Sequence, residues 1–256
     1  MRIASWNVNS IRARLGALTK WLDAQQPDVL LLQETKVVDD DFPREDLSRR
    51  GYSIVFAGQK SYNGVAILAQ HPIRNVTIGF HDDDPGADKR LITATIGDLR
   101  VSSAYVPNGK DITHPAFAEK LRWLERLREF LQAERARHEQ PVLVGGDFNV
   151  AHDERDVWSP AQFAGQLHFH PDERARLDAL IAAGFFDSFR RFCAEPARYS
   201  WWDYRGYTAR GNRGLRIDYL FLDQSLEERC KSAGIDAEPR QWDKPSDHVP
   251  VWVTID

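Results

Sequence analysis

Residues 141–149 read PVLVGGDFN, and this stretch is the strongest indication of the fold. Its apolar run, residues 142–144, is typical of a strand that is buried on both faces of a sheet. Gly145 and Gly146 follow, and glycines allow a sharp turn and leave room for a ligand. In an extended backbone, Asp147 and Asn149 then point the same way. An acid and an amide at this place indicate a functional site, although Gly-Asp and Asn are also typical of a plain turn.

The same pattern recurs along the chain, because several other predicted strands also end in polar side chains. Glu34 is the clearest example, since it follows four apolar residues, and an acid at the end of a buried strand needs a partner. A twisted sheet can bring such strand ends together in one crevice. The residues expected there are Asn7, Glu34, Tyr105, Asp147, Asn149, Asp218, Asp247 and His248.

Hydrophobic spacing predicts an α/β fold in which strands and helices alternate. Helices are expected at residues 12–25, at 116–137 and between Pro171 and Gly184. Strands are expected at residues 2–8, 29–32, 52–57, 63–69, 91–96, 99–106, 142–144, 199–204, 216–222 and 249–255. Residues 1–256 contain no linker or internal repeat, so we expect a single domain. Ten or more strands favour two packed sheets over one.

Composition excludes several classes of protein. The chain has 256 residues, 42% of them apolar, and a net charge of −4, so it has no overall basic character that would indicate a nucleic-acid binder. Cys193 and Cys230 lie far apart, which indicates free thiols in a reducing compartment. No signal peptide or membrane span is apparent at the sequence level. We therefore expect a cytoplasmic protein that is a monomer and does not contact membranes.

The collected residues are rich in oxygen ligands, which suits Mg²⁺ or Mn²⁺ and an attack of water on a phosphate. Asp147 is expected to orient or deprotonate the water, and Asn149 and Tyr105 to donate hydrogen bonds to phosphate oxygens. His248 is also expected to donate a hydrogen bond to a phosphate oxygen, as a cation that Asp218 or Asp247 holds in place. No Ser or Cys stands beside a base at an elbow, which disfavours a covalent route. The alternative for His248 is a strand cap without function.

Residues 198–216 combine cationic and aromatic side chains, a composition typical of nucleic-acid surfaces. The segment contains a single acid, Asp203. The alternative interpretation is an aromatic strand followed by a solvated arginine loop. The residues concerned are Arg198, Tyr199, Trp201, Trp202, Tyr204, Arg205, Tyr207, Arg210, Arg213 and Arg216, with Arg12, Arg14 and Lys20 near the N-terminus.

Seven motifs resemble those of the exonuclease III family of DNA-repair nucleases in their order and spacing. They are SWNVNSIRAR, PDVLLLQETK, AYVPNG, GGDFNVAH, YSWWDYR, NRGLRIDYLF and KPSDHVPVW, and they span nearly the whole chain. The resemblance implies a four-layer α/β sandwich, in which helices flank two packed mixed sheets. It also implies a Mg²⁺-dependent enzyme, with Mn²⁺ as a substitute, that acts on duplex DNA with abasic sites or blocked 3′ ends. The implied reactions are 5′ incision at abasic sites, 3′→5′ exonuclease action and 3′-phosphatase action.

The resemblance also implies roles for individual residues. Glu34 is the principal metal ligand, with Asn7 and Asp247 close by, and Asp147, Asn149 and His248 are further candidates. Asp147 resembles the acid that activates water, and Asn149 the transition-state donor. Tyr105 and His248 resemble phosphate contacts, and Asp218 the acid that orients the histidine. The implied DNA contacts are Trp201, Leu215 and Ile217, which line the pocket for a baseless sugar, together with Arg213 and Arg216.

The loop at residues 151–170 departs from the family's usual sequence, and His168 stands where close relatives often carry a small residue. We hypothesise that a bulky ring there, whether charged or neutral, narrows access for a flipped abasic sugar and favours 3′-end trimming; the alternative is an exposed loop histidine. Two alternative functions are compatible with the fold. The protein could be a phosphodiesterase that acts on a non-DNA substrate, or a DNA-binding module without catalytic activity. The presence of every expected carboxylate argues against the last.

Overall fold

The structure, a computed structural model, describes residues 1–204 and 211–256. Within these residues the strands form two six-stranded mixed sheets. The strand order in sheet A is β11 (Cys230–Ile235), β12 (Val251–Ile255), β1 (Arg2–Asn7), β2 (Val29–Gln33), β4 (Val65–Ala69) and β3 (Ser53–Ala57). The order in sheet B is β5 (Ile73–Ile78), β6 (Leu91–Ile96), β7 (Leu99–Tyr105), β8 (Val142–Asp147), β10 (Asp218–Asp223) and β9 (Phe185–Asp187).

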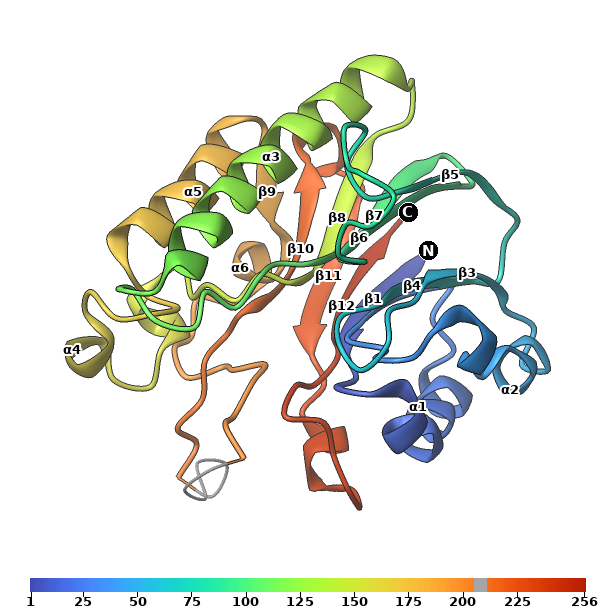
Figure 1. Cartoon of the computed structure of the whole chain (residues 1–256), viewed down its shortest axis with the longest axis horizontal. Coiled ribbons are helices and arrows are strands. Elements are labelled where there is room, and N and C mark those ends of the chain that lie inside the picture. The colour runs from blue at the N-terminus through green and yellow to red at the C-terminus, as the bar shows by residue number, and fades with distance from the viewer. Residues whose placement is uncertain (205–210) are drawn as a thin grey trace.

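Helices cover the outer face of each sheet, so the predicted four-layer sandwich is confirmed (Figure 1). The helices α1 (Ile11–Gln25) and α2 (Arg44–Ser48) pack on sheet A, and α3 (Pro115–Arg137) and α5 (Pro171–Ala182) pack on sheet B. Shorter segments are α4 (Pro160–Phe163), α6 (Ser188–Phe192) and the 3₁₀ turns η1 (Asp39–Asp41), η2 (Glu154–Asp156), η4 (Gln224–Leu226) and η5 (Glu238–Gln241). Among the described residues, no helix is long and apolar enough to cross a membrane.

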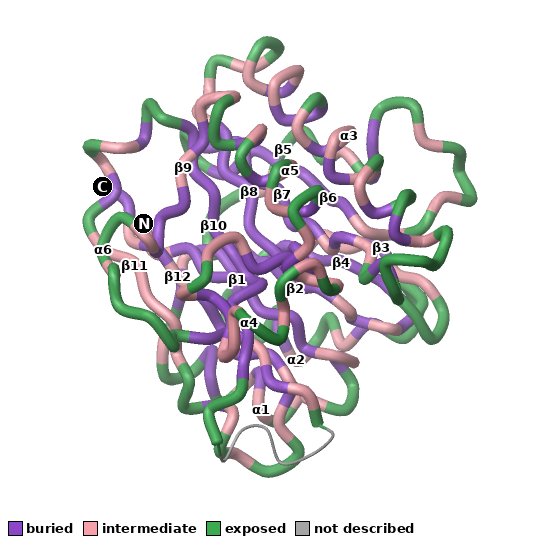
Figure 2. The backbone as a smooth tube through the Cα atoms, turned by 90° about the vertical axis from the view of Figure 1, so that its left-hand side faces the viewer, coloured by how far each residue is buried: buried purple, intermediate pink, exposed green. Residues whose placement is uncertain are grey.

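The two faces of the central strand β8 belong to different hydrophobic cores. In β8, Leu143 packs into the core between the sheets, whereas Val142 and Val144 pack against α3 and α5. All three residues are fully buried, which explains why this run is apolar without alternation. Figure 2 shows the buried strands at the centre of the molecule. Both sheets contribute side chains to the core between them. That residues 1–256 form a single domain stays a prediction.

Gly145 and Gly146 have a different role from the predicted turn, because both lie inside β8. A Cβ on Gly146 would lie 1.8 Å from the carbonyl oxygen of Ala104 in the neighbouring strand β7. A Cβ on Gly145 would lie 2.7 Å from Leu31 Cδ1 of the opposite sheet. The glycines therefore allow close packing around β8. The strand continues to Asp147 instead of ending before it.

Two further differences concern the extent of the strands. The segment at residues 199–204 is not a strand, since only Trp201 makes isolated bridges, to Leu215 and His248. The short or partly polar strands β5, β9 and β11 were not predicted, because their sequences show little alternation of apolar and polar residues.

Candidate active site

Strand directions explain how residues far apart in the sequence meet at one edge of the sandwich. Strand β1 runs parallel to β2, and β7 runs parallel to β8, so these four strands end at this edge. Strands β10 and β12 are antiparallel to β8 and β1, so they begin there. The register places Tyr105 and Asp218 on either side of Asp147.

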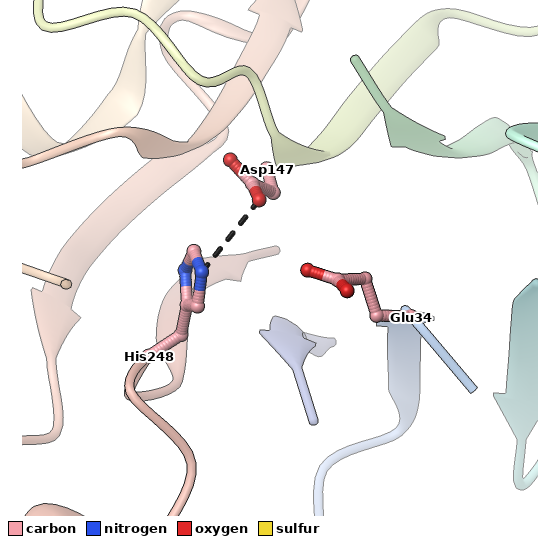
Figure 3. Close-up of side chains that lie close together, drawn as sticks. All are labelled: Glu34, Asp147 and His248. Carbon is pink, nitrogen blue, oxygen red and sulfur yellow. Dashed lines mark ion pairs between the residues drawn. The ribbon is translucent and has the colours of Figure 1, made fainter. Parts of the chain in front are cut away.

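Glu34, Asp147 and His248 are the central side chains of the site, and Figure 3 shows them pointing toward one another. Each offers a ligand atom, and these atoms lie within 4.8 Å of one another. Asn7 links the two sheets, because its side-chain amide donates to Glu34 Oε1 at 2.8 Å and to Asp147 Oδ2 at 2.9 Å. Four segments from two sheets therefore build one polar pocket.

Lys36 and Asn9 contact the carboxylates of Glu34 and Asp247 at the edge of the pocket. Lys36 Nζ lies 2.8 Å from Glu34 Oε2 and donates to Asn9 Oδ1 at 2.5 Å. Asn9 Nδ2 donates to Asp247 Oδ1 at 2.9 Å. Neither Lys36 nor Asn9 was predicted as a site residue. Their spacing was a usable signal, because each stands two positions after a predicted ligand, Glu34 and Asn7.

His248 is held by two acids. Its Nδ1 lies 2.9 Å from Asp218 Oδ2, and its Nε2 lies 3.7 Å from Asp147 Oδ2. Burial alone would lower the pKa of His248, but Asp218 and Asp147 outweigh it and raise this pKa to about 10. Ser200 fixes Asp218 in turn, with its hydroxyl donating to Asp218 Oδ2 at 2.6 Å. The arrangement produces a buried imidazolium with one N–H directed to the pocket.

Asp147 has the properties of a base near neutral pH. Burial raises the pKa of its carboxyl group to about 7; the charge of His248 opposes this, and Asp218 and Glu34 add to it. Tyr105, by contrast, stays a neutral phenol, because burial and the charges of Glu34 and Asp147 raise its pKa far above its usual value. The pocket thus contains a proton acceptor beside a hydroxyl donor.

Asn149 is held in an unusual backbone conformation. Its φ is +53°, and Glu34 and His168 are also left-handed, with φ values of +51° and +70°. Such residues are sparse outside glycine and concentrate at functional sites. The Asn149 backbone N–H donates to Asp147 Oδ1 at 2.9 Å, and its amide nitrogen lies 3.0 Å from the carbonyl oxygen of Val106. The same side-chain nitrogen also donates to Asp147 Oδ2 at 3.3 Å, so the amide lies against this carboxylate.

His168 and Trp201 form one wall of the pocket, with ring centroids 6.2 Å apart. His168 Nδ1 lies 2.6 Å from the carbonyl oxygen of Asn149, so this nitrogen carries the proton. Burial and the charge of Lys120 lower the pKa of His168 to about 3, so the ring is neutral. The cavity has a volume of about 130 Å³ and is lined by Glu34, Tyr105, Asn108, Asp147, Asn149, His168, Trp201, Asp247 and His248.

The remaining predicted DNA contacts are divided between surface and interior. Leu215 and Ile217 are buried beneath Trp201. Arg213 is exposed, and its guanidinium lies 5.1 Å from the centre of the Trp158 ring. Arg216 is 1% exposed and forms ion pairs with Asp156 and Asp187, so it has no free face for a phosphate. Arg205, Tyr207 and Arg210 lie outside the described residues.

The donor set fits a hard divalent cation. Carboxylate oxygens of Glu34 and Asp247 line the pocket, the amide of Asn7 contacts Glu34, and oxygen is the ligand that Mg²⁺ prefers. The protonated His248 has no lone pair to offer while Asp218 holds its Nδ1. A cation would therefore lie on the Glu34 side of the pocket, away from the positive charge of His248, and it would share Glu34 with Lys36, whose Nζ lies 2.8 Å from Glu34 Oε2.

Comparison with known proteins agrees with this geometry. The model of the endonuclease/exonuclease/phosphatase family matches residues 4–248. Exodeoxyribonuclease III of Haemophilus influenzae is 36% identical, with 98% of each chain covered. A 3′ phosphatase from Neisseria, solved with a product DNA hairpin, is 36% identical, with a TM-score of 0.96 over 100% of this chain and 99% of the other. An AP endonuclease from Archaeoglobus fulgidus is 38% identical, with a TM-score of 0.94 over the same shares. The chain therefore belongs to the endonuclease/exonuclease/phosphatase family and, within it, to the exonuclease III family.

Proposed function

We propose that this protein is a Mg²⁺-dependent DNA-repair nuclease that cleaves phosphodiesters at abasic sites and at the 3′ ends of duplex DNA. Its family supports a hydrolase that acts on DNA. One observation carries the proposal: Glu34, Asp147 and His248 meet in a pocket that Trp201 borders. A base, a cation and a metal ligand are the parts needed for attack of water on a phosphate.

Each side chain has a distinct task in the proposed reaction. Asp147 accepts the proton of the attacking water, and the N–H groups of His248 and Asn149 stabilise the charge that develops on the phosphorus oxygens. The hydroxyl group of Tyr105 donates a hydrogen bond to a phosphate oxygen. Asp218 keeps His248 protonated and oriented.

Glu34 would be the main ligand of a Mg²⁺ ion, with Asn7 and Asp247 near it. The ion, when bound, would polarise the phosphoryl oxygen and offset the charge on the leaving oxygen. The participation of Asp147, Asn149 and His248 as further ligands stays a prediction, as do the monomeric state and the cytoplasmic location. None of the residues that line the described cavity is a Ser, Thr or Cys, which favours direct attack of water over a covalent intermediate.

The experiment that tests this function uses a 5′-labelled duplex that carries either an internal abasic-site analogue or a 3′-phosphate. We expect Mg²⁺-dependent cleavage of at least one duplex and its loss in EDTA, with the Asp147→Asn protein as the control for contaminants. Activity on neither duplex would contradict the DNA substrate and favour a phosphodiesterase of the same fold with another substrate.

We further propose that the enzyme prefers 3′ ends, because His168 occupies space beside Trp201 that an abasic sugar would need. His168→Gly should therefore raise abasic-site incision about 10-fold and leave 3′-phosphate removal within a few-fold, since the energies of such pocket contacts are about 1–3 kcal/mol. Glycine accepts the φ of +70° at this position without strain, so the variant should fold.

The two duplexes described above measure both rates for each variant. His152→Ser is the matched control, because His152 belongs to the same loop but pairs with Asp178 outside the cavity. An unchanged ratio of the two rates in His168→Gly would contradict the proposed role of His168.

A further inference from the structure

A buried ion pair behind the pocket has no part in the reaction described so far. Lys120 extends from α3 and contacts Glu173 of α5, and neither side chain is exposed. Taking both charges out of water is unfavourable unless the pair satisfies further hydrogen bonds. The other hydrogen bonds of Lys120 and Glu173 therefore indicate what the ion pair holds in place.

Lys120 uses its other donors on two backbone carbonyls that lead into the pocket. Its Nζ donates to the carbonyl oxygen of Asn149 at 2.6 Å and to that of Asn108 at 3.2 Å. The side chains of these two residues also meet, because Asn108 Nδ2 donates to Asn149 Oδ1 at 3.2 Å. One ammonium group thus joins the two segments that follow β7 and β8.

The pair is itself held firmly from both sides. Glu173 Oε2 accepts the backbone N–H of His170 at 3.0 Å, as part of the capping box that begins α5. On the opposite side, Gly109 covers the stem of Lys120, and a Cβ on this glycine would lie 3.0 Å from Lys120 Cδ. The ammonium group therefore has little freedom to move.

We propose that Lys120, anchored by Glu173, is a positioning residue that sets the orientation of the Asn149 amide. Asn149 has a left-handed backbone, and its carbonyl carbon and its Cβ are bonded to the same Cα, so holding the carbonyl restricts the directions that the side chain can take. Lys120 Nζ holds this carbonyl together with His168 Nδ1, and the side-chain amide of Asn149 donates to Asp147 Oδ2 at 3.3 Å before any substrate binds. Lys120 is not expected to touch DNA, because it is fully buried. The inference rests on the proposed function of Asn149 as a transition-state donor.

The test is the double variant Lys120→Met/Glu173→Gln, which removes both charges together. Replacing both partners of a buried pair by neutral residues of similar size is often neutral for stability, whereas removing one leaves an unpaired charge. We expect kcat on the preferred duplex to fall about 10- to 100-fold with KM unchanged, since small misplacements of a catalytic group have effects of this size. Full kcat in the folded double variant would overturn the proposal.

The matched control is Arg100→Met/Glu134→Gln. This pair is as buried, at 1% exposure for each side chain, and Glu134 also belongs to α3. Arg100 lies near the start of β7, five residues before Tyr105 and about 16 Å away along the strand. We expect its kcat to be unchanged. An equal loss in the control would mean that loosening of α3, and not the contact with Asn149, is responsible.

Two additional measurements separate the positioning of Asn149 from an independent effect of the ion pair on catalysis. In an Asn149→Ala background, the Lys120→Met/Glu173→Gln change should have no further effect on kcat, whereas independent effects would multiply. If this double variant does not fold, Lys120→Leu/Glu173→Gln, which also leaves no unpaired charge, should still lower kcat, and an unchanged kcat would overturn the proposal.

A substrate-free readout distinguishes failure of this inference from failure of the proposed function. The side-chain amide resonances of Asn149, identified by their absence in Asn149→Ala, should shift in Lys120→Met/Glu173→Gln and not in the Arg100/Glu134 control. Inactive wild-type protein with shifted resonances would contradict the function but retain the positioning role. Unshifted resonances would overturn the positioning role even if the wild type cleaves DNA.

Discussion

Asp147→Asn is expected to lower kcat about 1,000-fold on every substrate that the enzyme cleaves, because an amide cannot accept the proton of the attacking water. Asn has the same shape and can still accept the hydrogen bond from Asn7, so KM should change little. Single-turnover cleavage of the labelled duplexes measures the effect. Asp223→Asn is the control, since Asp223 is also buried but lies at the opposite end of β10. A loss of less than about 10-fold would assign the base to another group.

The same variant should change how stability depends on pH in the presence of EDTA. The carboxyl group of Asp147 has a pKa of about 7 in the folded protein and about 3.9 in the unfolded chain. A raised pKa stabilises the fold below about pH 4, and this contribution is lost as the pH rises to about 7. The wild type should therefore lose stability relative to Asp147→Asn across this window. Denaturant unfolding at several pH values measures the difference, and a constant difference would contradict the raised pKa.

Glu34→Gln is the second change with a large expected effect, on metal affinity. Loss of this carboxylate should weaken binding of Mg²⁺ by at least about 100-fold, since even outer contacts of a metal site contribute 10- to 100-fold. The hydrogen bond from Asn7 can persist with a glutamine oxygen, so the pocket should keep its shape. Activity as a function of Mg²⁺ concentration measures the shift, and Mn²⁺ binding without DNA measures it independently.

Glu119→Gln is the matched control, because Glu119 is an exposed acid on α3. It should leave both titrations unchanged. Equal midpoints for the wild type and Glu34→Gln would remove Glu34 as the principal ligand and redirect attention to Asp147 and Asp247.

The sequence was sufficient to predict the sandwich and the residues at its catalytic edge, because strand ends are local features. Glu34 and Asp147 follow apolar runs that can be recognised without any knowledge of their partners. The family motifs then connect these ends. The roles of the individual residues stay predictions until the variants above are measured.

Other features depend on partners that no local pattern reveals. The arginine-rich segment around Arg216 predicts a DNA contact, yet Arg216 is buried and forms ion pairs with Asp156 and Asp187. Lys120 looks like an ordinary surface lysine on an amphipathic helix, and only the packing of α3 against α5 buries it. Similarly, Gly146 is required by the carbonyl of Ala104 in the adjacent strand and not by a turn of its own segment. Tertiary neighbours decide each of these cases.

The pairing of β1 with β12 has a consequence for the order of folding. It joins Ser5 to Val251 and encloses almost the entire chain in one loop, while Trp6 Nε1 donates to the carbonyl oxygen of His248 at 3.1 Å. Contacts of such sequence separation form slowly, because the entropy of closing the loop is lost before the contact is gained. Partly folded chains would therefore lack His248 at the catalytic edge. We therefore expect nuclease activity to appear during refolding no earlier than the pairing of β1 with β12.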